Sequence, residues 1–155
     1  MSEIRFFKMD NNWLSNFYPC KFVDKWGNEW KSVEHYFQAN KCKNKEDFKR
    51  IMEVETASEA KKISKKIEIK DNWDYIRLIV MANGVNMKFG QNPHLKNLLL
   101  GTNSVRLIEG NYWHDNFWGD CYCPKCYNIE GQNYLGRILM LVRKNIREKC
   151  DDRNL

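Results

Sequence analysis

A chain of 155 residues with 43% hydrophobic, 30% charged and 14% aromatic residues has the composition of one ordered globular domain, which excludes a low-complexity protein. No stretch reaches the ~18 consecutive apolar residues of a membrane-spanning helix, so we expect no membrane partner. The net charge of +6 favours an anionic partner such as a phosphate, a nucleotide or a nucleic acid.

The N-terminal half of the chain predicts short strands followed by helices. A helix is expected to begin after Ser32, which is a good N-cap residue, and a later one is capped by Thr56 or Ser58 and continues to about Lys66. Between them residues 46–52 form a further helical piece. The strands that precede these helices are expected at residues 4–7, 20–24 and 29–30, with a turn at residues 25–28.

The C-terminal half predicts longer helices and one extended loop. A helix over residues 73–89 is expected to end at Gly90, and the next is expected to begin at Asn92-Pro93 and to end at Gly101. A strand at 104–108, an irregular segment at 109–131 and a final helix at 132–149 complete the chain. These elements predict an α+β fold that is predominantly helical with a few short strands, in a single domain over residues 1–155 with its core at about 4–147.

The sequence SVEHYFQANK at residues 32–41 is the most informative stretch of the chain. At about 100° per residue, Gln38 lies about 40° from Glu34 on one side and Lys41 about 20° on the other, so a carboxylate, an amide and an amine share a narrow stripe. Polar groups at the margin of an apolar face sit where desolvation shifts their pKa values, as acid-base and amine chemistry require. The alternative is the polar edge of an ordinary amphipathic helix, which the pattern alone favours.

The sequence EGNYWHDNFWGD at residues 109–120 combines three acidic with four aromatic residues. Aromatic rings stack on a base, while carboxylates stabilise positive charge at the anomeric carbon of a sugar or activate water there. The loop therefore fits a site for ribose and base. It fits equally well an arrangement in which Trp113 and Trp118 fill the core and the acids cap turns.

Three cysteines follow this loop, in the spacing Cys121-x-Cys123-x-x-Cys126. A structural zinc site needs four ligands, commonly from two separated pairs, and here His114 would have to supply the fourth. We therefore expect buried or surface thiols and no tightly bound zinc or other metal. The N-terminal sequence MSEIR lacks the apolar stretch of a signal peptide, so we expect a cytoplasmic, intracellular protein whose six cysteines are mostly reduced. The run KKISKK at residues 61–66 predicts a solvated helix face.

Four blocks of the sequence stand out: LSNFYP (14–19), SVEHYFQANK (32–41), LIEG with DNFWG (107–110 and 115–119), and GQNYLGRILM (131–140) with Arg143. Together they resemble the NADAR family, which is also called YbiA-like. The blocks occur in the family order from about residue 4 to residue 147.

The resemblance implies a compact, mostly helical α+β domain whose members cleave N-glycosidic bonds. One branch of the family is similar to N-glycosidases of riboflavin biosynthesis, which hydrolyse early phosphoribosylamino-pyrimidine intermediates. Another branch removes ADP-ribose from guanine bases in nucleic acid. The resemblance also places Glu34, Lys41, Asp115 and Trp118 in the site, and it implicates Lys41 in a Schiff base with the ribose.

We therefore expect an N-glycosidase that acts on a small-molecule, ribosylated nucleotide-like substrate and needs no cofactor. Glu34 is the expected general acid/base, Asp115 stabilises the cation or orients water, and Lys41 attacks the opened sugar if the route is covalent. The rings expected to stack on the substrate are Trp113, Trp118, Tyr36 and Phe17. Arg5 and Lys21 are expected to bind a phosphate. The substrate-binding candidates are Arg5, Asn16, Phe17, Tyr36, Gln38, Glu109, Trp113, Trp118 and Gly119.

The chain departs from the commonest family pattern in two places, and both bear on the substrate. The segment between Glu109 and Asp115 is one residue longer and lacks the usual Ser-Pro, and the cysteine-rich insertion is not general. ADP-ribosylated guanine in nucleic acid is the alternative substrate, which the second branch of the family implies. A binding module for ADP-ribose or nucleic acid without turnover also fits the basic, aromatic composition, but such a groove gains nothing from carboxylates beside phosphates. A zinc-stabilised interaction domain rests on the cysteines alone.

Overall fold

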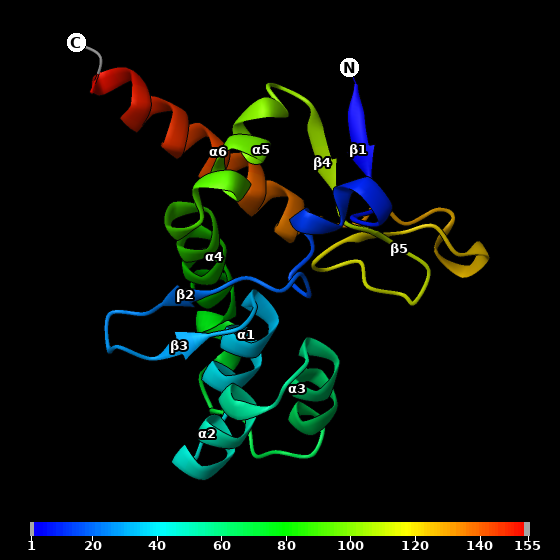
Figure 1. Cartoon of the computed structure of the whole chain (residues 1–155). Coiled ribbons are helices and arrows are strands. Elements are labelled where there is room, and N and C mark those ends of the chain that lie inside the picture. The colour runs from blue at the N-terminus through cyan, green and yellow to red at the C-terminus, as the bar shows by residue number, and fades with distance from the viewer. Residues whose placement is uncertain (1, 154–155) are drawn as a thin grey trace. The chain divides into compact units, whose positions relative to one another are not determined.

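The computed structural model describes residues 2–153, and the chain divides into two compact units. We call Asn16–Pro93 the helical unit, and Met1–Ser15 together with His94–Leu155 the terminal unit. Both units carry helices and short strands, and the colours of Figure 1 follow the chain through them from blue to red.

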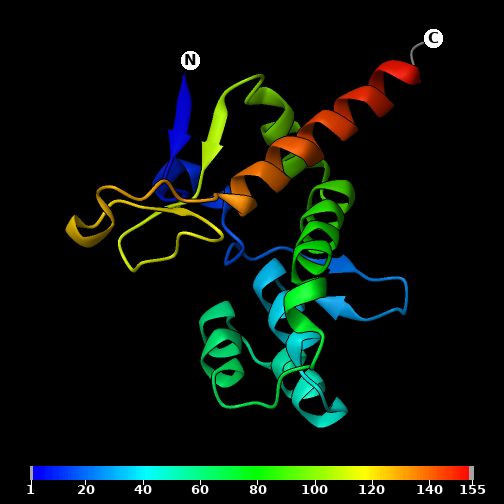
Figure 2. The same cartoon turned by 180° about the vertical axis from the view of Figure 1, so that it is seen from behind.

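The helical unit is built around α1 (Val33–Lys41), which packs against the other three helices of the unit. Figure 2 shows from behind how α4 passes α1. The other helices are α2 (Lys45–Glu53), α3 (Ala57–Ser64) and α4 (Trp73–Gln91), and the antiparallel strands β2 (Phe22–Val23) and β3 (Glu29–Trp30) precede α1.

Capping by side chains fixes where two of these helices begin. The hydroxyl oxygen of Ser32 accepts a hydrogen bond from the backbone N–H of His35 at 3.2 Å, so α1 begins where the sequence predicts. Thr56, and not Ser58, is the N-cap of α3, where it forms a reciprocal capping box with Glu59. Both caps lie in the segments that flank the candidate site.

Aromatic rings form the core on one side of α1. Tyr36 makes edge-to-face contacts with Trp30 and Phe22, with ring centroids 5.3 and 6.0 Å apart. Gly84 of α4 allows the ring of Tyr36 to approach, because a Cβ atom at this position would lie 2.9 Å from Tyr36 Cδ1. This packing fixes the rotation of α1 about its axis and hence the direction in which Glu34 faces.

The terminal unit pairs two distant segments of the chain. Strand β1 (Glu3–Arg5) runs parallel to β4 (Arg106–Ile108), with Ile4 opposite Leu107, and the two lie side by side in Figure 1. Helix α6 (Tyr134–Asp152) packs against β4. The other elements are η1 (Met9–Leu14), α5 (Pro93–Gly101), the parallel strands β5 (Gly110–Asn111) and β6 (Asp120–Cys121), and η2 (Pro124–Cys126).

The predicted fold class, α+β and predominantly helical with short strands, is confirmed. The segment 109–131 is more ordered than predicted, because β5 and β6 pair within it, and the 3-10 helix η1 was not predicted. A single domain over residues 1–155 stays a prediction. No helix within residues 2–153 has the length and apolar character needed to cross a bilayer.

The prediction that Gly90 ends a helix is wrong, because α4 continues to Gln91. The side chain of Gln91 accepts a hydrogen bond from the backbone N–H of Val23 and donates one to the carbonyl of Val23, both at 2.8 Å. Asn92 Nδ2 then donates to the carbonyl of Lys88 at 2.8 Å and satisfies a group at the end of the helix. These tertiary contacts outweigh the unfavourable helix propensity of one glycine.

Candidate active site

Glu34 is a buried carboxyl in the first turn of α1, with 6% of its surface exposed. Its backbone N–H donates to the carbonyl of Asn16 at 3.0 Å, and its Oε1 accepts a hydrogen bond from Gln38 Nε2 at 2.7 Å. Burial raises the pKa of Glu34 above its ordinary value, and the hydrogen bond from Gln38 and the charges of Lys61 and Lys41 lower it in part. A carboxyl in this environment holds its proton more tightly than an exposed one, as a general acid must.

Lys41 lies two turns after Glu34 on the same helix and is half-buried. Burial lowers the pKa of Lys41, and the charge of Glu34 raises it in part. Gln38 lies between them, and its Oε1 is buried with no hydrogen-bond partner among residues 2–153. The predicted stripe of carboxyl, amide and amine is therefore present, and the amide retains an acceptor for a ligand.

Lys61 of α3 acts on the same carboxyl. Its charge lowers the pKa of Glu34, and its Nζ lies 5.5 Å from the ring centroid of Phe17. Lys61 is half-buried, whereas the next residue, Lys62, is exposed. The predicted solvated face agrees with the exposed Lys62, Lys65 and Lys66, whereas Lys61 is half-buried beside the candidate site.

A pocket of about 1080 Å³ lies in the helical unit, beside the segment that leads into α1. A ligand pocket typically has a volume of about 300–1,000 Å³, so this one has room for a nucleotide-sized molecule. Of the predicted substrate-binding residues, Phe17 lines this pocket. Lys21, a predicted phosphate ligand, lines it too. Its wall also contains Lys31, Ser32, His35, Glu55, Thr56 and Ser58.

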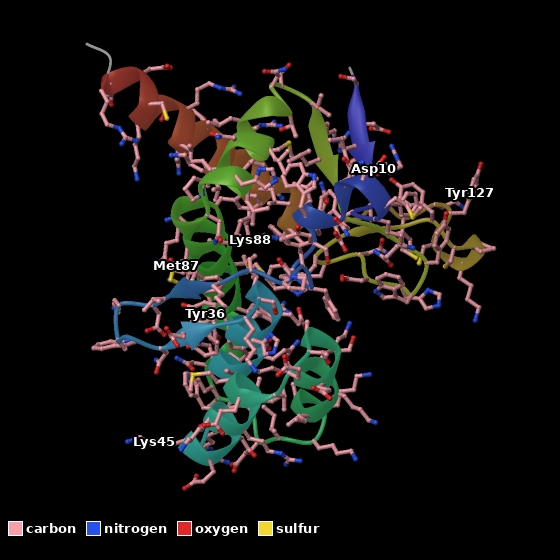
Figure 3. The ribbon with its side chains drawn as sticks, viewed as in Figure 1. Asp10, Tyr36, Lys45, Met87, Lys88 and Tyr127 are labelled. Atoms are coloured by element: carbon pink, nitrogen blue, oxygen red, sulfur yellow. The ribbon has the colours of Figure 1, made fainter. Side chains whose placement is uncertain are left out.

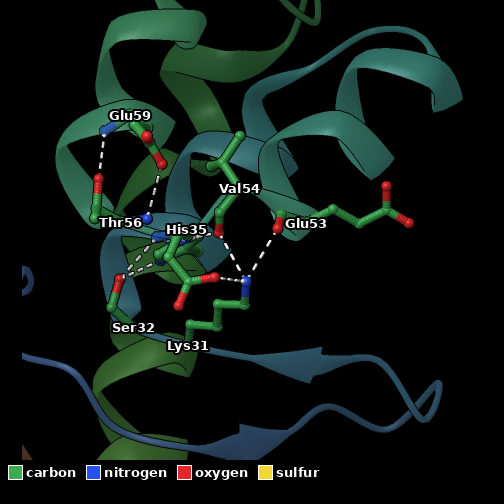
Figure 4. A network of polar contacts seen from close by, with 8 residues as sticks. Lys31, Ser32, His35, Glu53, Val54, Thr56 and Glu59 are labelled. Atoms are coloured by element: carbon green, nitrogen blue, oxygen red, sulfur yellow. Dashed lines mark hydrogen bonds and ion pairs between the residues drawn. The ribbon is translucent and has the colours of Figure 1, made fainter.

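A polar network supports this wall, as Figure 4 shows. Burial lowers the pKa of His35, which favours the neutral ring. Nε2 lies 3.1 Å from the carbonyl oxygen of Val54, which can only accept, so Nε2 is the donor. In the neutral ring Nδ1 then accepts from the hydroxyl of Ser32 at 2.7 Å. The ammonium of Lys31 donates to the carbonyls of Glu53 and Val54, both at 3.0 Å. The network joins the start of α1 to the segment between α2 and α3, so the wall is held in place before a ligand binds.

In the terminal unit, Asp115 organises the predicted functional loop. Its Oδ1 accepts hydrogen bonds from the backbone N–H groups of Phe117 at 3.1 Å and Trp118 at 2.9 Å. Asn111, a buried residue of β5, donates to the carbonyl of Asp115 at 2.7 Å and accepts from its N–H at 3.1 Å. Asp115 therefore holds a tight turn, which was the structural alternative to a catalytic role, and the same bonds fix its carboxylate in one position.

The N-terminus of α6 anchors the segment that carries Trp118 and Gly119. The N–H groups of Leu135 and Asn133 donate to the carbonyls of Trp118 and Gly119, both at 3.0 Å. Gly119 approaches the backbone of Glu109 so closely that a Cβ atom would lie 2.1 Å from that carbonyl oxygen. Glycine is required here for steric reasons, which are independent of any contact with substrate.

Glu109 and the two tryptophans differ in their surroundings. Glu109 is half-buried between β4 and β5, where Asn133 Oδ1 accepts a hydrogen bond from its N–H at 2.9 Å. The ring of Trp118 is half-buried and meets Phe117 edge to face at 4.8 Å, whereas Trp113 is 56% exposed. Trp113 therefore does not fill the core, and its surface is open to a ligand.

Arg5, a predicted phosphate ligand, already contacts the side chains of Glu3 and Tyr122. Its Nε donates to Glu3 Oε1 at 2.7 Å, and its guanidinium lies 4.7 Å from the ring centroid of Tyr122, whose hydroxyl it also contacts. The carboxylate of Glu3 neutralises part of its charge. Phosphate binding by Arg5 stays a prediction.

Asn16 and Tyr36 lie in supporting positions. Asn16 is buried; its carbonyl binds the N–H of Glu34, and its Nδ2 donates to Met81 Sδ at 3.2 Å. Tyr36, labelled in Figure 3, is buried in contact with the rings of Trp30 and Phe22. A residue two positions after Glu34 lies about 160° away around the helix. Tyr36 therefore does not share the face of Glu34, and its placement does not support the prediction that it stacks on substrate.

The cysteine spacing belongs to a group of four candidate metal ligands. Nδ1 of His114 lies 3.3 Å from Cys123 Sγ and 3.4 Å from Cys126 Sγ, and with Cys121 Sγ the four ligand atoms all lie within 4.8 Å of one another. The sequence names His114 as the possible fourth ligand but does not place it near the three thiols. The fold does place it there, so the spacing of the cysteines is no longer a reason to expect no zinc.

Sequence reasoning overlooked the residues whose roles depend on neighbouring elements. Lys61 reaches the surroundings of Glu34 from α3, and the pair of Ser32 and His35 forms the wall of the pocket. The only signal in the sequence was that Ser32 and His35 stand inside the second family block. Lys61 stands in a lysine-rich run in which no single residue is distinguished.

The sequence model described as the NADAR domain matches residues 5–147, so the chain belongs to the NADAR domain family. N-glycosidase YbiA of Escherichia coli (strain K12) is 33% identical to this chain over 142 residues, which cover 86% of this chain and 80% of that protein. The NMR structure of the E. coli protein YbiA matches with a TM-score of 0.83 and 28% sequence identity, over 96% of this chain and 86% of that chain. The predicted family and its YbiA-like fold are confirmed.

A longer relative is a riboflavin biosynthesis protein of Vibrio vulnificus (strain YJ016), which is 37% identical over 153 residues. The match covers 94% of this chain and 39% of that protein. The chain therefore spans about two fifths of the length of this relative.

Proposed function

We propose that this chain is an N-glycosidase that hydrolyses the bond between a ribose carbon and a nitrogen atom in a nucleotide-like substrate. The observation that carries this proposal is the pair on α1, a buried carboxyl with a raised pKa and a half-buried amine with a lowered pKa. Relatives named N-glycosidase YbiA and riboflavin biosynthesis protein support it. An ordinary amphipathic helix does not bury its polar edge to this extent.

Glu34 is the proposed general acid/base. When the C1′–N bond breaks, positive charge develops on the sugar and the leaving nitrogen must receive a proton. Because burial raises the pKa of Glu34, its carboxyl is protonated at a higher pH than an exposed glutamic acid and can deliver that proton. The resulting carboxylate then takes a proton from the attacking water, which returns Glu34 to its starting state.

Lys41 is the proposed nucleophile of a covalent route. Once the sugar ring of an N-glycoside opens, C1′ is an imine carbon to which the neutral amine of Lys41 can add. The substrate nitrogen leaves with the proton supplied by Glu34, and an imine between Lys41 and the sugar remains. Water hydrolyses this imine and releases the sugar as an aldehyde. Burial favours the neutral amine that this step needs.

Asp115 and Trp118 are proposed site residues through the family block in which they stand. The carboxylate of Asp115 would stabilise the cation or orient water, and the ring of Trp118 would stack on the base. The fixed position of Asp115, held by two backbone N–H groups, supports a role that depends on orientation. Phe17 and Lys61 are proposed to contact the substrate in the helical unit, where Lys61 would pair with a phosphate.

We propose phosphoribosylamino-pyrimidine intermediates of riboflavin biosynthesis as the substrate, and ADP-ribosylated guanine in nucleic acid as the alternative. The name of the Vibrio relative supports the first, and the net charge of +6 is compatible with both. An intracellular location would follow from either substrate. The six cysteines, all free thiols, are compatible with a reducing compartment.

The test is to incubate the purified chain in parallel with both substrates and to measure the released base by chromatography and mass spectrometry. Glu34→Gln should reduce turnover by about 10²–10⁴-fold, because glutamine keeps the shape but cannot exchange a proton. The matched control is Glu46→Gln on the exposed side of α2, which should leave turnover unchanged. Release of base from neither substrate would contradict the proposed function, and equal activity of the two variants would remove Glu34 from it.

A further inference from the structure

The group formed by His114, Cys121, Cys123 and Cys126 lies in the terminal unit and takes no part in the proposed hydrolysis. The three cysteines are buried, with 3%, 8% and 5% of their surfaces exposed, and His114 is exposed. Three thiols and one imidazole form the Cys₃His ligand set of closed structural zinc sites. We propose that these four residues bind one zinc ion, which cross-links the loop between β5 and α6.

The distances within the group fit tetrahedral coordination. Zn–S bonds of about 2.3 Å and Zn–N bonds of about 2.0–2.1 Å at a tetrahedral angle separate sulfur from nitrogen by about 3.5 Å. His114 Nδ1 lies 3.3 Å from Cys123 Sγ and 3.4 Å from Cys126 Sγ. Both nitrogen–sulfur distances are therefore close to the edge length of a zinc tetrahedron, and all four ligand atoms lie within 4.8 Å of one another.

Two of the sulfur atoms accept hydrogen bonds from N–H donors, as metal-bound thiolates commonly do. The backbone N–H of His114 donates to Cys121 Sγ at 3.3 Å, and Asn116 Nδ2 donates to Cys126 Sγ at 3.4 Å. Donors of this kind stabilise negative charge on sulfur and orient the ligands around a metal. Three buried thiols that served only as packing would need neither the donors nor the imidazole.

The backbone is arranged to bring the histidine to the cysteines. His114 has φ of 68°, a left-handed conformation that is uncommon for a residue other than glycine. Asn116 Oδ1 accepts a hydrogen bond from the N–H of Cys121 at 2.9 Å, and the pairing of β5 with β6 places Asn111 opposite Cys121. The unfavourable conformation of His114 is explained if a metal bond holds its ring in place.

Zinc would bind as Zn²⁺ while the three thiols release their protons, so that the site becomes three thiolates, one neutral imidazole and the ion. No bond to the protein backbone changes and no electron is transferred. The ion would fix His114, which directly precedes Asp115 in the loop. Holding His114 in place would also restrict the movement of Asp115. Any consequence of this for catalysis rests on the proposed function, whereas the zinc site itself does not.

The experiment measures metal in the full chain purified from zinc-supplemented medium. Elemental analysis should find about one zinc per chain in the wild type and in Cys150→Ser, whose thiol lies on α6 outside the group. Cys123→Ser should lose the ion and unfold at a lower temperature. His114→Ala changes an exposed side chain, so it should fold even if Cys123→Ser does not, and should bind zinc at least about 10-fold more weakly.

Cobalt gives a second readout that reports the ligands themselves. Co²⁺ added to the chelator-treated chain should produce the intense near-ultraviolet band of thiolate-to-cobalt charge transfer and the visible bands of tetrahedral cobalt. Both should be absent in Cys126→Ser and present in Cys150→Ser. The proposal is overturned if the wild type contains less than about a tenth of a zinc per chain and gives no charge-transfer band. It is also overturned if every variant keeps zinc with unchanged affinity, because the ion would then lie elsewhere.

Discussion

Replacing Glu34 by glutamine should stabilise the chain at neutral pH while it lowers turnover by about 10²–10⁴-fold. Burial raises the folded-state pKa of Glu34 above the unfolded value of about 4.3. The stability that comes from the neutral carboxyl is therefore complete below about pH 4.3, and it is lost as the pH rises through the raised pKa of the folded chain. Glutamine removes this loss because it cannot ionise.

The size of the effect follows from the surroundings of the carboxyl. A buried polar group that lacks a hydrogen-bond partner lowers the free energy of unfolding by about 1–3 kcal/mol, and a charged group lowers it by more. Gln38 can still donate its hydrogen bond, now to the amide oxygen of the variant. The lost attraction to Lys61 and Lys41, both half-buried, opposes the gain by about 1 kcal/mol at most. A net gain on the order of 1 kcal/mol corresponds to a rise of about 2–4 °C in Tm for a chain of this size.

The assay is thermal unfolding followed by circular dichroism at about pH 4 and about pH 7.5, with Glu46→Gln as the exposed control. The rise in Tm of Glu34→Gln over the wild type should appear at the higher pH and disappear at the lower pH. Glu46→Gln should show no rise at either pH. A Glu34→Gln variant that is equally destabilised at both pH values would show that the ionised carboxylate is not costly. Burial would then not be the cause of a raised pKa at Glu34.

Three further predictions concern single residues. Borohydride added during turnover should fix the sugar to Lys41 in the wild type but not in Lys41→Arg, since guanidinium stays protonated; full activity of the variant with no adduct in the wild type would limit Lys41 to an electrostatic role. Lys61→Ala should shift the pH profile of turnover to higher pH, because the charge of Lys61 lowers the pKa of Glu34. Lys62→Ala, at an exposed residue, should leave the profile unchanged. Identical profiles for the two variants would contradict the coupling between Lys61 and Glu34. Gly119→Ala should lower Tm by several degrees, because its Cβ would lie 2.1 Å from a backbone carbonyl oxygen; an unchanged Tm would mean that the loop relaxes freely.

Local geometry let the sequence alone predict the central helix of the candidate site. The positions i, i+4 and i+7 face the same way in any α-helix, so Glu34, Gln38 and Lys41 had to share a face once Ser32 began the helix. The four motif blocks likewise identified the family without reference to contacts. Both inferences depend on residues close together in the chain.

The side on which a residue is buried was decided only by tertiary structure. Tyr36 stands next to the stripe in sequence, but Gly84 and Trp30 provide a place for its ring in the core. Gly90 suggests a helix end, yet the bonds of Gln91 to Val23 carry the helix past it. In both cases contacts with another element contribute more free energy than the local preference of one residue.

The two groups with the greatest chemical consequence also required the fold. Lys61 differs from Lys62 because α3 packs against α1, which leaves Lys61 half-buried with its charge acting on Glu34 and Lys62 exposed. His114 joins the cysteines because β5 pairs with β6 and because its own backbone adopts a left-handed turn. The sequence determined which reactive groups are present and which share a helix face. Packing between elements determined which of them are buried and which lie within bonding distance, because burial and proximity depend on segments that sequence spacing does not relate.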